Sequence, residues 1–353
     1  MHPTCLDQLN FQTRSHGSSL PRRKGRLCIC SALPPATCSE AVSEARAALR
    51  RYREASREND SNVESDASAV TATATTTTEN QLLATTKNRL TVQLPVPSPN
   101  YKNDDLFRCF DEGEWPGGIQ QRFRALRPCV ENFIDSFGSP SFVGMLESPA
   151  DGIGVWTALN GTATVVTFVN NATFAPFVRL CQGDFGDKVL NSEHVLIAIN
   201  PNWTQSKDIG QLWDRKLKKK AAELIDDPNS WLPLYHLEDV RTAAGSLGVL
   251  WRSFPGPWRL YSAVVGSELL VEIGGEERGN VASRIGNILS GKNSRSDEDS
   301  ALVAVELLLE SEIRPGRSEM IQLLNAANTQ RKQDEKSKKK TGKKLGQGWW
   351  GGL

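Results

Sequence analysis

Two loops bring together residue types that could form a binding site. Residues 200–203 read Asn-Pro-Asn-Trp and follow an apolar, β-branched run at residues 194–199. Ligands of open α/β sheets bind outside the carboxyl ends of the strands, so Asn200, Asn202 and Trp203 are candidates to line a crevice. The alternative is a structural turn, in which Asn and Pro shape the backbone and Trp203 covers the sheet.

The second loop, residues 251–259, reads Trp-Arg-Ser-Phe-Pro-Gly-Pro-Trp-Arg and joins two predicted strands. Trp and Arg dominate protein interfaces because they bring large contact areas and bidentate donors. The candidate docking residues are Trp251, Arg252, Pro255, Gly256, Trp258 and Arg259. The alternative is that the prolines fix a tight connection and both tryptophans belong to the core.

Catalytic chemistry finds little support in the sequence. The set Cys181, Asp184, Asp187 and His194 matches no metal-ligand spacing. Ser253 lies in no G-x-S-x-G turn, and the glycine-rich residues 274–279 lack the Lys-Ser/Thr ending of a phosphate loop. We therefore assign no catalytic residue, no metal and no cofactor, which favours a role other than catalysis.

Two lysine-rich segments could bind anions. We interpret residues 216–220 as the solvated outer face of a helix. Lysines attract anionic headgroups and tryptophans settle at the membrane interface, so the C-terminal run predicts peripheral membrane attachment through Lys338, Lys339, Lys340, Lys343, Lys344, Trp349 and Trp350. RNA could use the same charges, and a disordered solubilising tail is a further alternative. The net charge of +1 excludes steering by a strong overall field.

The first 32 residues have the composition of an organelle transit peptide. They contain a single acid, Asp7, among several arginines and serines. Residues 26–32 would suit a plastid processing site, so we expect the mature protein in the chloroplast stroma. The odd number of cysteines, seven, indicates a reducing compartment.

The elements that must position these residues follow from the apolar pattern. After Leu33-Pro-Pro we expect a helix with apolar positions from Ala41 that runs to about Arg53. We then expect a disordered Thr-rich insertion at 59–86, a strand at 89–95, a helix at 117–138, and strands at 142–146, 154–158, 162–169 and 194–199. Asp208 and Gln211 predict a capping box for an amphipathic helix whose apolar face includes Ile209, Trp213 and Leu217.

Beyond that helix we expect a short helix at 237–244 and strands at 248–253, 258–264 and 268–273. Further helices would carry Val281 and Ile285, then Leu302, Val305 and Leu308, and finally Met320 and Leu324. The predicted fold is α/β: a mixed sheet with a partly parallel core and a C-terminal antiparallel meander, flanked by helices. The predicted parts are a transit peptide (1–32), an α/β domain (33–293), C-terminal helices (294–330) and a basic disordered tail (331–353).

Several motifs occur together in one order along residues 33–290: Leu33-Pro-Pro, Trp115-Pro-Gly-Gly-Ile, Asn200-Pro, the segment 231–235, and Phe254-Pro-Gly-Pro-Trp. This order resembles a plastid and cyanobacterial domain-of-unknown-function family that includes the low photosystem II accumulation assembly factor and the C-terminal region of a chloroplast adenylate kinase. The resemblance carries no catalytic residues.

The resemblance implies a chloroplast accessory or assembly factor for photosystem or thylakoid protein biogenesis. Its partners would be plastid proteins, such as photosystem subunits or other assembly factors, with peripheral thylakoid contact. One alternative is a small-molecule or nucleotide-binding α/β enzyme using the crevice near Asn200 and Trp203. The other is an RNA-binding plastid protein, although nucleic acid is the less favoured partner.

Overall fold

The computed structural model describes residues 33–65, 88–97, 117–135, 138, 140–184, 194–203, 205–211, 213–227, 230–265 and 302–346. They belong to one compact unit, Leu33–Leu353. The predicted leader, the predicted strand at 268–273, the helix with Val281, and the Trp349-Trp350 pair lie outside the described residues, as does most of the Thr-rich segment.

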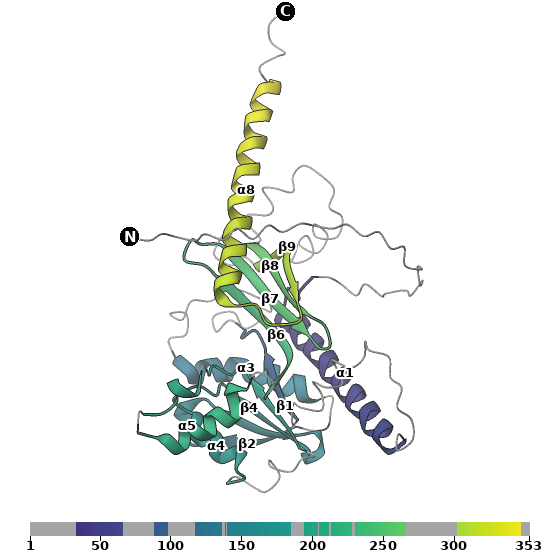
Figure 1. Cartoon of the computed structure of the whole chain (residues 1–353), viewed down its shortest axis with the longest axis vertical. Coiled ribbons are helices and arrows are strands. Elements are labelled where there is room, and N and C mark those ends of the chain that lie inside the picture. Colours follow the sequence, from purple (N-terminus) through teal and green to yellow (C-terminus); the bar gives the residue numbers. More distant parts are fainter. Residues whose placement is uncertain are drawn as a thin grey trace, which may run out of the picture. The chain divides into compact units, whose positions relative to one another are not determined.

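The described residues form a nine-stranded mixed sheet in the order β2-β3-β4-β5-β1-β6-β7-β8-β9 (Figure 1). Its strands are β1 (Arg89–Gln93), β2 (Ser141–Met145), β3 (Gly154–Ala158), β4 (Ala163–Thr167), β5 (Val195–Ile199), β6 (Leu232–Arg241), β7 (Leu247–Ser253), β8 (Trp258–Val265) and β9 (Leu302–Ser311). The central strands β4, β5, β1 and β6 pair in parallel. The other neighbouring strands pair antiparallel, which confirms the predicted α/β fold class with its C-terminal meander.

Helices cover both faces of the parallel strands. On one face α1 (Cys38–Ser65) and α3 (Gly118–Asp135) pack with Leu90, Val165 and Ile197. On the other, α4 (Phe174–Cys181) and α5 (Arg215–Ala221) pack with Val166 and Leu196. Successive residues of a strand point to opposite faces, so a strand between two helical layers must be apolar throughout. β5 has this composition, as predicted from its β-branched run.

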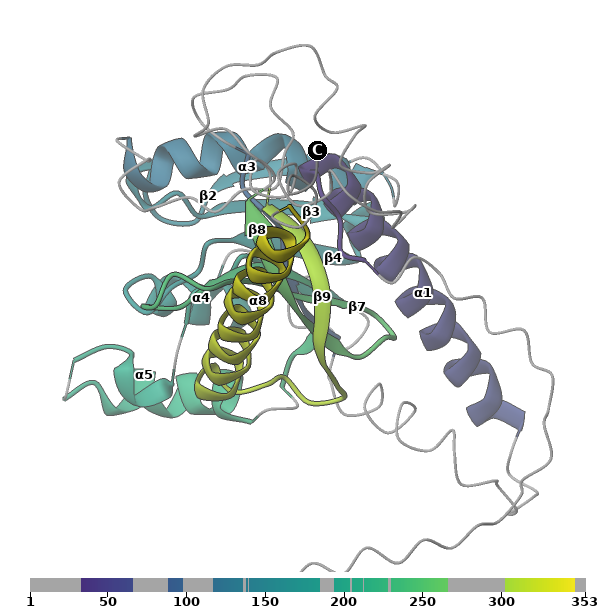
Figure 2. The ribbon, with the colours of Figure 1, turned by 90° about the horizontal axis from the view of Figure 1, so that it is seen from above.

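A last helix, α8 (Arg317–Gly346), covers the antiparallel strands and lies along β8 and β9 (Figure 2). Met320 and Leu324 pack with Val240, Leu250 and Leu260. Val249 and Trp251, which flank Leu250 in β7, instead pack in the hydrophobic cluster that contains the buried residues of α1. The two helices α1 and α8 therefore cover opposite faces of β7. Short turns complete the described elements: η2 (Pro149–Asp151), η3 (Leu159–Gly161), η5 (Ser206–Asp208) and the π-helical η6 (Ala222–Asp226).

Two predicted helices are strands. The segment 237–244 was expected to be a helix, but most of it belongs to β6, which pairs with both β1 and β7. The segment with Leu302, Val305 and Leu308 is β9, which pairs with β8 along its length. Short leucine-rich runs suit either structure, and here tertiary pairing decides. The sheet consequently continues to Ser311, past the expected domain end at 293.

Three helix boundaries also differ from expectation, and one helix was not foreseen. α1 runs on to Ser65, inside the segment expected to be disordered from Asn59. α8 continues to Gly346, so residues 331–346 of the predicted disordered tail are helical. The predicted capping box at Asp208 and Gln211 is wrong, because α5 begins later, with Asp214 as its N-cap. α4 follows β4 where no element was expected.

Candidate functional site

The carboxyl edge of the parallel strands contains the first predicted site. β1 connects through α3 towards β2, whereas its neighbour β5 connects through α5 to β6, on the far side of β1. Connections that leave adjacent strands in opposite directions create the position where open α/β sheets bind ligands. Asn200 directly follows β5, and Leu94 directly follows β1.

Asn200 fastens these two strand ends together. Its Oδ1 accepts a hydrogen bond from the Leu94 amide at 2.7 Å, and its Nδ2 donates to the Leu94 carbonyl at 2.9 Å. The side chain is buried, and the backbone has φ of 50°, a region that Asn tolerates better than most residues. Both polar atoms of the Asn200 side chain are thus bonded to the Leu94 backbone, which favours the interpretation of this loop as a structural turn.

The other two predicted residues of this loop, Asn202 and Trp203, lie in different environments. Asn202 is exposed, and its backbone amide donates to the Val169 carbonyl at 2.8 Å. Trp203 packs in an aromatic cluster, with ring centroids 5.6 Å from Phe177 and 5.1 Å from Trp231. Trp203 therefore covers the α4 side of the sheet, and Asn202 is the residue of the three whose side chain faces solvent.

Sequence reasoning missed Arg122 near this edge. It comes from the start of α3, and its guanidinium carbon lies 5.4 Å from the Phe168 ring. Phe168 follows β4 and has φ of 54°. In the described part of the chain, the Arg122 Nε is buried without a hydrogen-bond partner. The edge therefore has a cation, but the sequence contains no signal that separates Arg122 from the other arginines of this helix.

The second predicted site, residues 251–259, is divided between the two faces of the sheet. Trp251 and Trp258 are both buried, the former with the α1 cluster and the latter with the α8 cluster. The Arg259 guanidinium lies 5.6 Å from the Trp251 ring and donates to Glu310 at 2.7 Å. Pro255 is exposed after a cis peptide bond, and Gly256 is half-buried. Both tryptophans thus belong to the core.

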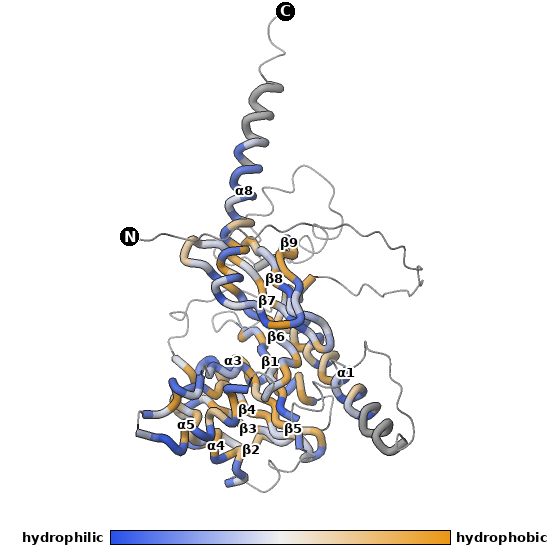
Figure 3. The backbone as a smooth tube through the Cα atoms, viewed as in Figure 1, coloured by the Kyte–Doolittle hydropathy of each residue, from blue (hydrophilic) through white to orange (hydrophobic). Residues whose placement is uncertain are grey.

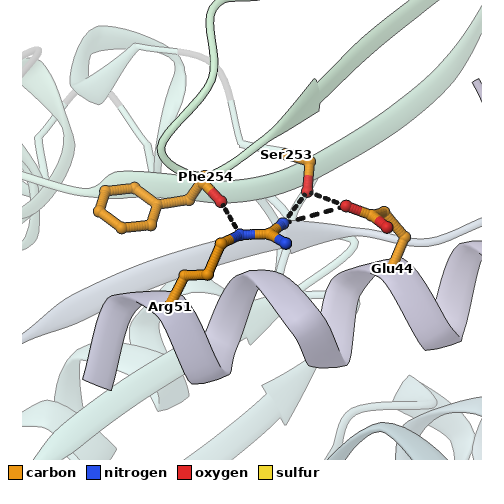
Figure 4. A network of polar contacts seen from close by, with 4 residues as sticks. All are labelled: Glu44, Arg51, Ser253 and Phe254. Atoms are coloured by element: carbon orange, nitrogen blue, oxygen red, sulfur yellow. Dashed lines mark hydrogen bonds and ion pairs between the residues drawn. The ribbon is translucent and has the colours of Figure 1, made fainter. Parts of the chain in front are cut away.

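This corner is also tied to α1, as Figure 4 shows. Arg51 donates from Nε to the Phe254 carbonyl at 2.7 Å and from Nη2 to the Ser253 hydroxyl at 2.8 Å. Glu44 accepts from Arg51 at 3.0 Å and from the Ser253 hydroxyl at 2.8 Å. The network holds the corner against a helix, which indicates a structural role for Ser253.

Arg252 and Trp258 contribute to a polar cluster on the other face. His236 Nε2 lies 2.8 Å from Glu238 Oε2, and Arg314 donates to the same oxygen at 3.1 Å. The Trp258 ring lies 5.0 Å from the imidazole, with Arg252 5.4 Å from that indole. The register places His236 opposite Arg252. This cluster could not be predicted from the sequence, because its members lie on separate strands and a loop.

Burial lowers the pKa of His236 from its ordinary value, although the hydrogen bond and charge of Glu238 act in the opposite direction. Burial would raise the pKa of Glu238, but the hydrogen bond from His236 and the charges of His236, Arg314 and Arg317 hold it below its ordinary value. The cluster thus favours a neutral His236 beside an ionised Glu238, whose charge Arg314 balances. Over the described residues, no group of three or more His, Cys, Asp or Glu side chains could hold a metal ion.

The lysines of the predicted tail lie on α8. This helix contacts the sheet between Met320 and Arg331, and the exposed side chains that follow include Lys332 and Lys336. Lys338, Lys339, Lys340, Lys343 and Lys344 continue the same helix. Figure 3 shows hydrophilic colours on the turns of α8 that directly follow its sheet contacts. None of the helices within the described ranges combines the length and apolarity needed to cross a bilayer.

Fold and surface together define a mixed-sheet α/β protein with a basic helix fixed to its antiparallel edge. The chain belongs to the family described as Domain of unknown function (DUF1995), whose model matches residues 35–278. Comparison with curated proteins found no match, and comparison with solved structures found none either.

Proposed function

We propose that this protein is a chloroplast accessory factor that docks on an anionic membrane surface through α8 and supports the biogenesis of photosystem or thylakoid proteins. The observation that carries the docking is the attachment of a strongly basic helix to a folded domain. The leader composition and the family resemblance support the compartment and the class of client.

Polar contacts fix the first half of α8 to the sheet. Asn325 Oδ1 accepts from the hydroxyls of Thr242 and Ser246, both at 2.9 Å. Asn328 donates to the Ser246 hydroxyl at 3.0 Å, and Arg331 donates to the Ser262 hydroxyl at 3.2 Å. With Leu324 also buried, this half of the helix is held against the sheet, and the second half continues the same helix beyond it.

The positive charge of the second half of α8 is complementary to an anionic surface. Residues 331–344 hold eight basic residues against two acidic ones, in a chain whose net charge is only +1. Lys332, Lys336 and Lys340 are spaced four apart, and like charges at this spacing oppose each other on a helix. Each lysine near an anionic leaflet contributes about 1 kcal/mol of attraction, so lipid contact would favour both binding and helicity.

The alternatives have weaker support. An enzyme or small-molecule binder at the strand-end crevice would need Asn200, whose side chain already bridges Leu94. RNA binding could use the lysines of α8, and a direct comparison of ligands separates it from membrane binding.

Flotation with vesicles tests the docking. The full chain should float with phosphatidylcholine vesicles that contain phosphatidylglycerol, and high salt should release it, because exposed charges are screened. Reversing Lys336, Lys339, Lys340 and Lys343 to Glu should lower the bound fraction by at least about tenfold, since this removes several lysine contacts. The matched Lys→Arg variant keeps the charge and should still float.

Three results would overturn the proposal. Deletion of residues 331–353 could leave vesicle binding unchanged, a single-stranded RNA could bind where vesicles do not, or a fluorescent fusion of the full chain could stay in the cytosol of plant cells. Affinity purification of the tagged protein from chloroplasts would test the client, and recovery without any photosystem or thylakoid protein would contradict that part.

A further inference from the structure

Trp213 is exposed in a way that the sequence does not predict. Its helical spacing with Ile209 and Leu217 indicated a core position, yet 78% of the residue faces solvent. The other large apolar residues that are exposed in the described part of the chain are Val143, Leu307 and Ile313. None of those is aromatic. A single exposed apolar residue is not by itself a binding site, so the residues around Trp213 decide what this one can do.

The fold holds this indole outward. Ile209 is fully buried before it, while Leu217 and Ala221 pack against the α4 cluster after it. The Asp214 carboxylate accepts from the Leu217 amide at 3.3 Å and starts α5 one residue beyond Trp213. Trp213 thus lies outside the helix whose apolar face it was expected to join.

Further contacts fasten the loop that carries Trp213. The Ser206 amide donates to Asp226 at 3.0 Å, and the Ser206 hydroxyl donates to the same carboxylate. The Lys218 ammonium donates to the Lys207 carbonyl at 3.0 Å. The start of the segment is therefore tied to α5 and to the residues that follow it, and its end leads directly into the Asp214 cap.

Cations follow Trp213 closely along the chain. Arg215, Lys216, Lys219 and Lys220 are exposed on α5, and together with Trp213 we call them the Trp213 patch. Of the nearby acids, Asp214 caps the helix, Glu223 lies 3.3 Å from Lys220, and Asp226 is bound to Ser206. Asp208 and Asp227 are also exposed, and each has an interaction partner.

We infer that the Trp213 patch is a second membrane contact, which inserts the Trp213 indole among the headgroups of an anionic lipid surface while the α5 cations bind lipid phosphates. The inference rests on the proposed function and adds an apolar anchor to the electrostatic contact of α8. Indole rings favour the level of the headgroups, and lysines next to them can extend to the same depth.

The composition of the patch favours lipid over nucleic acid. Single-stranded nucleic acids bind platforms of several aromatic rings, on which successive bases stack. The patch has one aromatic ring, and most of its cations are lysines, which act as flexible point charges rather than as planar bidentate donors.

The test uses the full chain with the Trp213→Ala variant. Because the ring is exposed, this change should leave the fold intact, and an unchanged thermal midpoint checks that. We expect about a fivefold to tenfold lower partition into phosphatidylglycerol-containing vesicles, from the lost burial of one large ring. Ile313→Ala is the matched control: Ile313 is 79% exposed, but its neighbours include Glu310 and Glu312. It should bind like the unchanged chain.

Salt separates this inference from the proposed function. The apolar contribution of Trp213 persists at high salt, whereas the lysine contribution of α8 is screened, so the relative defect of Trp213→Ala should remain. Normal vesicle binding by Trp213→Ala, with binding still lost on reversal of the α8 charges, would overturn the Trp213 contact and leave α8 docking intact. Absence of vesicle binding by the unchanged chain would overturn both, as would Trp213-dependent binding to oligouridine alone.

Discussion

Asn200 links the strand ends at the position where a ligand would be expected. The amide side chain matches both polar groups of the Leu94 backbone, donating to one and accepting from the other. Few side chains can do both, and the positive φ narrows the choice further. Asn200 was the strongest candidate for a binding crevice, because of its residue type and its position after β5. Its side chain instead joins the ends of β5 and β1.

We expect Asn200→Ala to lower the free energy of unfolding by about 2–4 kcal/mol, because two buried backbone groups lose partners and Ala resists positive φ. Asn200→Gly tolerates that φ and should cost less. Urea denaturation of both variants measures the difference, and Asn202→Ala, at an exposed side chain, is the control. A fully stable Asn200→Ala would contradict the role of the side chain.

His236 makes stability sensitive to acid. Its folded-state pKa lies below the ordinary value of 6.5, because burial disfavours the imidazolium. As the pH falls through about 6.5, the unfolded chain takes up the proton first, so the folded state loses stability. Glu238, whose pKa is also lowered, adds a loss only at more acidic pH, below its ordinary value of 4.5.

His236→Gln should therefore flatten the decline of the thermal midpoint between about pH 7 and pH 5. Gln stays neutral and can still donate to Glu238. Differential scanning calorimetry across that range compares the slopes, and all other titrating groups are shared by the two proteins. Equal slopes would show that the folded protein does not resist protonation of His236.

At the scale of elements, the close contact between β7 and α8 depends on Gly248. A Cβ at this position would lie 2.5 Å from Leu324 Cδ2 and 2.8 Å from the Tyr261 carbonyl oxygen. The leucine side chain can rotate, but the carbonyl belongs to the paired strand β8. The bare Gly248 backbone thus sets how near the helix approaches the sheet.

Gly248→Ala should destabilise the protein by about 1–3 kcal/mol, the usual cost of overpacking a core. It should also loosen α8, which limited proteolysis of that helix would detect as faster cleavage. Gly316→Ala is the control, because a Cβ there meets no atom within 4 Å. Unchanged stability and cleavage in Gly248→Ala would contradict the packing described for Leu324.

Which elements could be predicted from sequence depends on how much local pattern each contains. The alternation of β1, the one-sided apolar face of α3 and the β-branched run of β5 are local signals, and all three elements are present. α4 has Pro176 and an almost wholly apolar sequence, which shows no polar face. β6 and β9 become strands through long-range pairing, which no local window contains.

The same reasoning applies to the candidate sites. The basic run of α8 is visible as composition, but its attachment through Asn325 and Asn328 depends on distant partners. The exposure of Trp213 depends on which acid caps α5: a helix begun at Asp208 would bury the ring, and one begun at Asp214 does not. A choice between two equally good caps lies beyond sequence pattern alone.

At the scale of the whole molecule, β9 lies past the limit of the family match, which ends at residue 278. A recombinant fragment cut at that limit would lose both β9 and α8. The outer edge of β8 would then offer unpaired amides and carbonyls to any extended peptide, and Leu250 and Leu260 would lose their cover. Soluble expression therefore calls for a fragment that reaches at least Arg331, where the last described side-chain tie to the sheet is made.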